Sequence, residues 1–245
     1  MSKPYDEYSQ QSILRYAKKL EGKTLRLTLS DEDISNIELD CEKHPGNKGK
    51  LGHNVEKYYF EYELNSSSFT DFPCGLELKV TPLYVKKNRE YAPKERLVCN
   101  IINYMEIVNE TWDKSTFLGK NRDILIIRYI DPMDKNIHLL DYEILDAHIH
   151  NIFSNSDDAK QFEKDWNIIV NKIKEGKAHL LSEKDTEYLA ANTKGADRES
   201  SYREQPNNDE LAKQRSFSFK PKFLKKILND QGIIRHPQAI DLKEV

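Results

Sequence analysis

A short stretch of the chain carries two carboxylates and a lysine in an order that suits metal-dependent cleavage of phosphodiesters. Asp71 precedes a Phe-Pro-Cys-Gly segment, and the alternating run Leu-Glu-Leu-Lys-Val follows at residues 76–80. An extended chain would point Glu77 and Lys79 to one side and the aliphatic residues to the other. The proline and glycine predict a turn that folds Asp71 back toward Glu77. We therefore expect two carboxylates and one lysine to converge.

This donor set favours Mg²⁺, which prefers carboxylate oxygens and accepts a phosphate oxygen into its shell. A bound Mg²⁺ would polarise a phosphate and lower the pKa of a bound water, while Lys79 stabilises charge or orients the nucleophile. A plainer interpretation stays open for these residues alone. Glu and Lys also alternate on solvated strand faces as a simple ion pair, and so short a pattern occurs by chance in many proteins.

Further blocks accompany this stretch in a fixed order. They are GLELKVTP at 75–82, KERLVCNIINY at 94–104, KLG at 50–52 followed by Glu56, FLGK at 117–120, and the segments 164–178, 193–196 and 212–217. In this order they resemble the MutH and Sau-type family of GATC-cutting DNA endonucleases, and the later blocks resemble the Sau-type restriction branch. The resemblance covers about residues 45 to 228, which is far more specific than any single block.

The resemblance implies roles for individual residues. It makes Glu56 a further active-site glutamate and Lys120 an auxiliary active-site lysine. The implied catalytic set is Glu56, Asp71, Glu77, Lys79 and Lys120, and the implied Mg²⁺ site comprises Glu56, Asp71, Glu77 and Leu78.

The spacing between the aspartate and the first strand glutamate departs from the family by one residue. This chain has one residue fewer between Asp71 and Glu77 than the family usually has. A deletion within a strand would turn Asp71 away from the metal, whereas a deletion within the turn would not. We expect a shorter turn.

The resemblance also implies a DNA-facing side. Asn192, Thr193 and Lys194 match a family loop that reaches base edges in the major groove, where a lysine can donate to guanine. Asn192 replaces an arginine of the MutH branch. Phe223 stands where the MutH branch has a tyrosine near the adenine amino group, so an adenine methyl group would meet no hydroxyl there.

A basic strip near the carboxyl end is a second candidate for DNA contact. Between Leu211 and Asn229 it contains Lys213, Arg215, Lys220, Lys222, Lys225 and Lys226 and no acid, interleaved with Phe217, Phe219 and Phe223. Such a strip could follow phosphates and offer flat rings to a groove. Its plainer interpretation is an ordinary solvated helix and strand end.

Composition is consistent with a cytoplasmic enzyme. The chain has 245 residues, a formal net charge of −3 and three cysteines without paired spacing, which indicates reduced thiols. It shows no N-terminal apolar segment and no run long enough to span a membrane. We expect a single endonuclease domain over residues 1–245, with its core at about 45–228 and an N-terminal helical extension at 1–44.

Periodicity predicts an α/β fold with a restriction-endonuclease-like core, a mixed central β-sheet flanked by helices. Helices are expected at 5–20, from about Gly52, and at 157–174, with residues 31–50 as a loop. Strands are expected at 98–102, 124–130 and within 137–149, where His148 and His150 share a face. The polar stretch 192–210 is expected to be a long loop.

The sequence therefore predicts a Mg²⁺-dependent type II restriction endonuclease that cuts double-stranded DNA at GATC-like sites. A strand-nicking mismatch-repair enzyme and a DNA-binding module without catalysis stay as alternatives. One active site cuts one strand, and the chain is shorter than relatives with a second domain. We therefore expect a homodimer on DNA and no contact with membranes.

Overall fold

The computed structural model describes residues 3–44, 50–62, 69–195 and 201–236. Its α-helices are α1 (Gln10–Ala17), α2 (Asp31–Lys43), α3 (Lys50–Asn54), α4 (Tyr104–Ile107), α5 (Thr116–Asn121), α6 (Ser156–Lys174) and α7 (Pro221–Asp230), and η3 (Val55–Tyr59) is a π-helical turn. Its strands are β1 (Leu76–Val85), β2 (Tyr91–Pro93), β3 (Leu97–Ile101), β4 (Asp123–Ile130), β5 (Ile144–Asn151), β6 (Leu189–Thr193), β7 (Tyr202–Gln205), β8 (Asn208–Lys213) and β9 (Arg215–Phe219).

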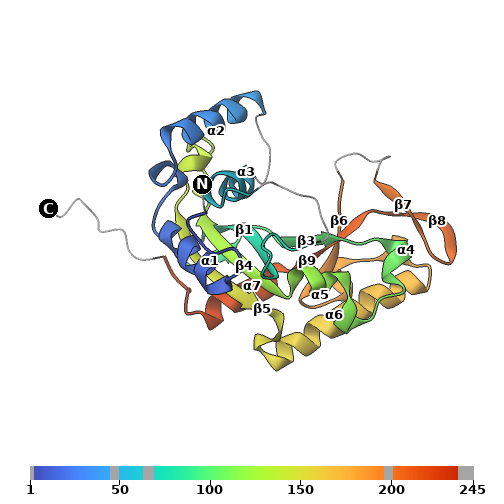
Figure 1. Ribbon diagram of the computed structural model, residues 1–245. Helices are drawn as coiled ribbons and strands as arrows, with labels where there is room; N and C mark the ends of the chain where they lie inside the picture. Colours follow the sequence, from blue (N-terminus) through green and yellow to red (C-terminus); the bar gives the residue numbers. More distant parts are fainter. Residues whose placement is uncertain (1–2, 45–49, 63–68, 196–200, 237–245) are drawn as a thin grey trace.

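The central sheet has the strand order β2-β1-β4-β5 and mixes strand directions. β1 runs parallel to β4, while β2 and β5 are antiparallel to their neighbours. Helices lie on both sides of this sheet (Figure 1). The expected mixed sheet flanked by helices is confirmed.

A second, antiparallel sheet has the order β3-β9-β6. The strand expected at 98–102 belongs to this sheet, so its predicted place in the central sheet was wrong. The reason is a pairing distant in sequence, since Leu97 of β3 lies opposite Phe219 of β9.

The central strand β4 is buried on both faces, as a strand in the middle of a covered sheet should be. Ile124 and Ile126 join the core formed with α6 and the second sheet. Leu125 and Ile127 join the core formed with the N-terminal helices. The predicted alternation along β1 also holds, because Leu76 and Leu78 face the N-terminal core.

The long helix α6 follows its sequence pattern closely. Asn155 caps it by accepting hydrogen bonds from the backbone of Asp157 and Asp158. Its buried stripe includes Phe162, Trp166 and Ile169. The predicted stop is also present, because Gly176 adopts φ +70°, a conformation that glycine tolerates best.

The N-terminal region differs from its prediction. The first helix begins at Gln10 rather than near residue 5, because the Ser9 side chain caps it. The predicted loop at 31–50 was wrong for most of its length, since α2 occupies Asp31–Lys43. Ser30 caps α2. Three acidic side chains in its first turn stabilise the helix further, because their negative charges lie near the positive end of the helix dipole.

The polar stretch 192–210 is also more ordered than predicted within its described part. It contains β7 and the start of β8, which pair as an antiparallel hairpin. Asn207 in the connecting turn has φ +58°, a value that asparagine accepts more easily than most residues. Among the described helices, none is both long enough and apolar enough to cross a membrane.

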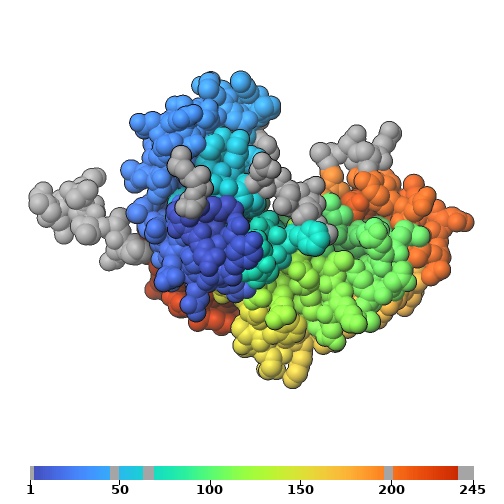
Figure 2. Space-filling model, viewed as in Figure 1, coloured from blue at the N-terminus to red at the C-terminus, as the bar shows by residue number. Residues whose placement is uncertain are grey.

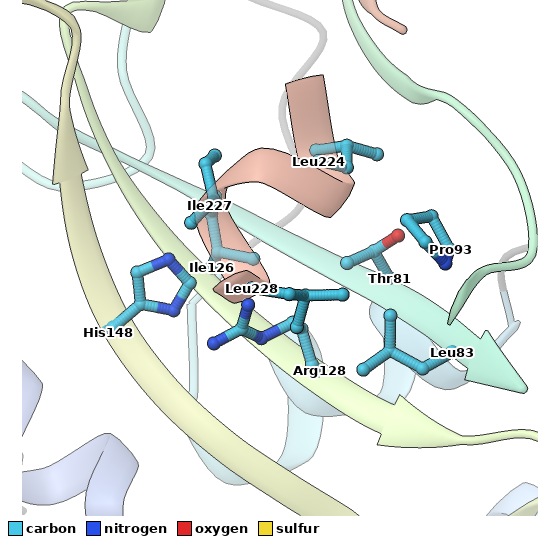
Figure 3. Close-up of a pocket in the computed structure, with 9 residues that line it drawn as sticks. All are labelled: Thr81, Leu83, Pro93, Ile126, Arg128, His148, Leu224, Ile227 and Leu228. Atoms are coloured by element: carbon cyan, nitrogen blue, oxygen red, sulfur yellow. The ribbon is translucent and has the colours of Figure 1, made fainter. Parts of the chain in front are cut away.

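Two histidines of β5 lie beneath α7, away from water. His148 lines a small gap with Ile126 and Arg128 of β4 and with residues of α7 (Figure 3). His150 contacts the ring of Phe223 at 5.5 Å between centroids. Burial lowers the pKa of His148 to about 2 and that of His150 to about 4, so both are neutral in the fold.

These depressed pKa values predict acid sensitivity of the fold. Unfolded histidine binds a proton below its ordinary pKa of 6.5, which the folded His148 and His150 do not do until much lower pH. Stability should therefore be full above pH 6.5 and fall below it, by about 2 kcal/mol per histidine between pH 7.5 and 5. Urea unfolding at the two pH values measures this loss.

A pair of variants assigns the effect. His148→Gln should shrink the stability loss between pH 7.5 and 5, whereas His44→Gln should leave it unchanged, because the His44 side chain is 66% exposed. An equal loss in His148→Gln and the wild type would contradict the assignment.

Candidate active site and nucleic-acid interface

Glu77 and Lys79 project from the same face of β1, as their spacing predicts. The Glu77 side chain is only 1% exposed, and its Oε1 accepts a hydrogen bond from Lys79 Nζ at 2.6 Å. Its other oxygen, Oε2, is buried and has no hydrogen-bond partner in the part of the chain that the structure describes. A buried carboxylate oxygen of this kind is costly unless something binds there.

Lys120 reaches the same carboxylate from α5. The Ser115 side chain caps this helix, which places Lys120 in its last turn. Lys120 Nζ lies 3.7 Å from Glu77 Oε1, and the lysine side chain is 15% exposed. Glu77 thus lies between two lysines from different elements.

Asp71 is joined to β1 through a tight turn. The backbone of Phe72 donates to Leu76 at 3.0 Å, and Gly75 closes the turn with φ +79°. Asp71 Oδ2 then accepts a hydrogen bond from the Leu78 backbone at 2.7 Å. Through this turn Asp71 lies beside the beginning of β1.

Glu56 reaches the site from η3, where the chain widens into a π-helical turn after α3. Tyrosines hold this turn to the N-terminal region. Tyr59 donates from its hydroxyl to the Tyr16 backbone at 2.8 Å, and Tyr5 donates to the Phe60 backbone at 2.6 Å. The rings of Tyr16 and Tyr59 also stack, with centroids 4.5 Å apart.

Neighbouring charges affect the ionisation of Glu56, Glu77 and Lys79. Burial, followed by the negative charge of Asp71, raises the pKa of Glu56 to about 7. Burial also raises the pKa of Glu77, although Lys79 and Lys120 oppose that shift. For Lys79, burial favours the neutral form, but the Glu77 charge, the hydrogen bond to Glu77 and the Asp71 charge together outweigh it and raise the lysine pKa. The structure therefore gathers Glu56, Asp71, Glu77, Lys79 and Lys120.

The chemistry of this site fits a divalent cation. Crowded carboxylates favour a cation that offsets their repulsion, and the bare Oε2 of Glu77 is a hard oxygen donor. As the described side chains stand, however, they form no group of three or more His, Cys, Asp or Glu able to hold a metal ion. Glu77 Oε1 is instead engaged by Lys79.

A groove leads from this site toward the predicted DNA-reading residues. It has a volume of about 440 Å³ and is lined by Lys120 at one place and Lys194 at another, with β3 residues such as Cys99 and Asn100 between. Figure 2 shows a broad hollow between the region of α2 and α3, in blue and cyan, and the orange β7–β8 hairpin. Thr193 and Lys194 are exposed at the end of β6.

Two predicted DNA contacts lie inside the protein instead. Asn192 is 3% exposed, and its amide donates to Ser218 of the neighbouring strand. Phe223 is fully buried and packs at 4.7 Å from Phe162 and 4.8 Å from Tyr188, centroid to centroid. The expected contact of Phe223 with a DNA base was therefore wrong, because Phe223 is a core residue. Phe223 then gives no reason to expect that the protein accommodates an adenine methyl group.

The basic strip is likewise not a free positive surface. Arg215 donates to the carbonyls of Ala191 and Leu181 and so supports the second sheet. The strip's rings Phe217 and Phe219 are fully buried. Its other described pairs are Lys220 with the carbonyls of Glu183 and Thr186, Lys222 with Glu187, Lys225 with Glu90 at 3.8 Å, and Lys226 with Asp158 and Asp230. Lys213 is exposed at the end of β8.

Two neighbours of the site escaped the sequence analysis. Tyr62 follows η3, and Glu56, Asp71 and Glu77 all influence the pKa of its phenol. Cys99 of β3 lines the groove near Lys79, and burial raises the pKa of its thiol to about 12. Nothing in the local pattern signals either residue, because each approaches the site through tertiary packing.

The chain is similar in sequence to known proteins over most of its length. The family model described as the DNA mismatch repair enzyme MutH matches residues 60–165. The type II restriction enzyme Sau3AI of Staphylococcus aureus is 36% identical over an alignment of 245 positions, which covers 97% of this chain and 47% of that protein. The chain therefore spans about half the length of that relative. The DNA mismatch repair protein MutH of Buchnera aphidicola subsp. Baizongia pistaciae (strain Bp) is 27% identical over 190 residues, 76% of this chain and 80% of that protein.

The tyrosine contacts generate a prediction about local stability. Tyr59→Phe removes the hydroxyl that donates to the Tyr16 backbone and leaves that carbonyl without this partner. Global stability should fall by about 1 kcal/mol, and amide exchange at residues 55–60 should accelerate. Urea unfolding and hydrogen exchange test both effects.

The matched control is Tyr8→Phe, because Tyr8 is 72% exposed and should tolerate the change. Unchanged exchange at residues 55–60 in Tyr59→Phe would show that the hydrogen bond does not hold the π-helical turn.

Proposed function

Since the chain belongs to the MutH and Sau-type family of DNA endonucleases, we propose that it is a Mg²⁺-dependent type II restriction endonuclease acting at GATC-like sites. The observation that carries this proposal is the buried Glu77 carboxylate, whose Oε2 has no hydrogen-bond partner among the described residues and whose Oε1 is held by Lys79, with Asp71 near enough to raise the pKa of both Glu56 and Glu77. A structural ion pair alone would need only Glu77 and Lys79.

Mg²⁺ would be held by Glu56, Asp71 and Glu77, with Leu78 as the backbone contribution between them. When bound, it would polarise the scissile phosphate and lower the pKa of a water molecule. The bare Glu77 Oε2 supports this assignment because it offers a hard donor already removed from bulk water.

The chain's own lysines would act directly on the reacting groups. Lys79 Nζ, fixed by Glu77 at 2.6 Å, would orient the attacking water and stabilise its developing negative charge. Lys120 lines the groove, with its Nζ 3.7 Å from Glu77 Oε1, and would stabilise negative charge on the phosphate. Both lysines are largely shielded from solvent, which strengthens their interaction with an anion.

The mismatch-repair alternative has two observations in its favour, the match of residues 60–165 to the MutH family model and the 27% identity to a MutH protein. A strand-nicking enzyme would use the same active site with one copy of the chain. Restriction would need two copies, one for each strand, and we propose a homodimer on DNA. The binding-only alternative is disfavoured because such a module has no need for crowded buried carboxylates.

We further propose that residues 1–245 act as one endonuclease domain in the cytoplasm. Tyr5, Ile13 and Leu20 of the N-terminal extension share a hydrophobic core with Leu76 and Leu78 of β1, which supports this unit.

The direct test is incubation of the purified protein with unmethylated and methylated plasmid in Mg²⁺, followed by sequencing of the ends. Restriction predicts double-strand ends at GATC-like sites. Nicks in one strand would support the repair alternative. Absence of any cleavage, with retained DNA binding, would support the binding-only module and contradict the proposal.

Removing either member of the β1 ion pair should abolish cleavage. We expect Glu77→Ala and Lys79→Ala to reduce the cleavage rate by at least about a hundredfold while DNA binding in Ca²⁺ stays largely intact. Single-turnover cleavage and fluorescence anisotropy measure the two quantities.

Lys87→Ala is the control for this pair, because Lys87 is exposed just beyond β1 and outside the site. It should cut at the wild-type rate. Wild-type cleavage by Lys79→Ala would show that the active site is misassigned.

Lys194 generates a prediction about specificity. As an exposed lysine on the groove, it would donate to a guanine edge, so Lys194→Ala should reduce discrimination between GATC and near-cognate duplexes by about 1 to 3 kcal/mol. Lys213→Ala should weaken binding to both duplexes equally, as loss of a phosphate contact does. Titration of each variant against both duplexes separates the two roles. Equal losses for Lys194→Ala would make it a phosphate contact.

A further inference from the structure

Tyr62 ends in a buried hydroxyl that has no hydrogen-bond partner among the described residues. Its ring packs edge-on against Phe72, with centroids 5.8 Å apart, at the turn that carries Asp71. An unpartnered buried hydroxyl is unfavourable, so its persistence needs an explanation. The packing against Phe72 would be served equally well by phenylalanine.

The surroundings of this hydroxyl are the active-site carboxylates. After burial itself, the charges of Asp71, Glu56 and Glu77, in that order, raise the pKa of Tyr62, and a side-chain contact with Asp71 adds to them. A tyrosine phenol is protonated at neutral pH and is therefore a neutral donor. Asp71 is the carboxylate with the largest influence on it.

Asp71 needs two supports to keep a fixed orientation. The Leu78 backbone donates to Oδ2 at 2.7 Å, which fixes one oxygen from the β1 side. A donor from the Phe72 side would fix the plane of the carboxylate. A tyrosine suits this task better than a lysine, because a neutral donor adds no positive charge that would repel a divalent cation.

We propose that Tyr62 is a positioning residue of this site, whose hydroxyl donates a hydrogen bond to Asp71 when a divalent cation is bound. This inference rests on the proposed endonuclease function and adds a residue to its site. Tyr62 would hold Asp71 in the orientation that binds the cation, without touching the reacting atoms.

The test is Tyr62→Phe, which keeps the ring and removes only the oxygen. Cleavage at saturating DNA should slow roughly tenfold, the effect of losing one hydrogen bond to a charged group. The Mg²⁺ concentration for half-maximal rate should rise severalfold, while DNA binding in Ca²⁺ and the thermal midpoint should stay unchanged. A purely packing role would change none of these metal-dependent quantities.

A second readout does not need catalysis. The affinity of the protein for Mn²⁺, measured by electron paramagnetic resonance, should fall severalfold in Tyr62→Phe. Tyr58→Phe is the matched control, because Tyr58 belongs to the neighbouring π-helical turn, and it should bind Mn²⁺ like the wild type.

The outcomes separate the two proposals. If the wild type cuts DNA and Tyr62→Phe matches it in rate, Mg²⁺ dependence and Mn²⁺ binding, the role of Tyr62 is wrong and the proposed function stands. If the wild type cuts no DNA, the proposed function fails, and Mn²⁺ binding still decides whether Tyr62 supports Asp71. A lowered thermal midpoint in Tyr62→Phe would reduce the residue to packing.

Discussion

The mutual repulsion of carboxylates in a poorly hydrated place is the constraint on which this structure depends. Glu77 is almost fully buried, and Glu56 and Asp71 lie near enough to disfavour further negative charge. Two lysines, Lys79 and Lys120, offset this repulsion from different elements. Such an arrangement is unfavourable for folding and useful for chemistry, because it creates a strong demand for positive charge at one point.

The scaffold meets this constraint with contacts that are distant in sequence. Tyr5 bonds to the backbone of Phe60, 55 residues away, and Tyr59 bonds to the backbone of Tyr16, 43 residues away. The π-helical turn that carries Glu56 is thereby fixed from its far side. The N-terminal extension is part of the site's framework, since its helices share a core with β1.

The features that the sequence predicted correctly are those encoded locally. Alternation along β1, the apolar stripe of α6 and the turn before Glu77 each lie within a few residues of one another. The cap of α2 was equally local, with Ser30 before three acids, but the histidine, proline and glycine beyond it suggested a loop. The burial of Phe223 was not predictable, because it depends on Phe162 and Tyr188, which arrive from other elements.

The ion pairs of the strip's lysines affect how many counterions the proposed endonuclease would release from DNA on binding. Lys222, Lys225 and Lys226 already have carboxylate partners, and Lys220 is held by backbone carbonyls. A cation neutralised within the protein displaces few counterions from the duplex. Affinity should therefore change only gently with ionic strength, since its logarithm falls by about 0.9 per phosphate neutralised for each tenfold rise in salt. In the proposed endonuclease, selectivity would then come from a few residues in the groove that contact base edges, and not from bulk charge.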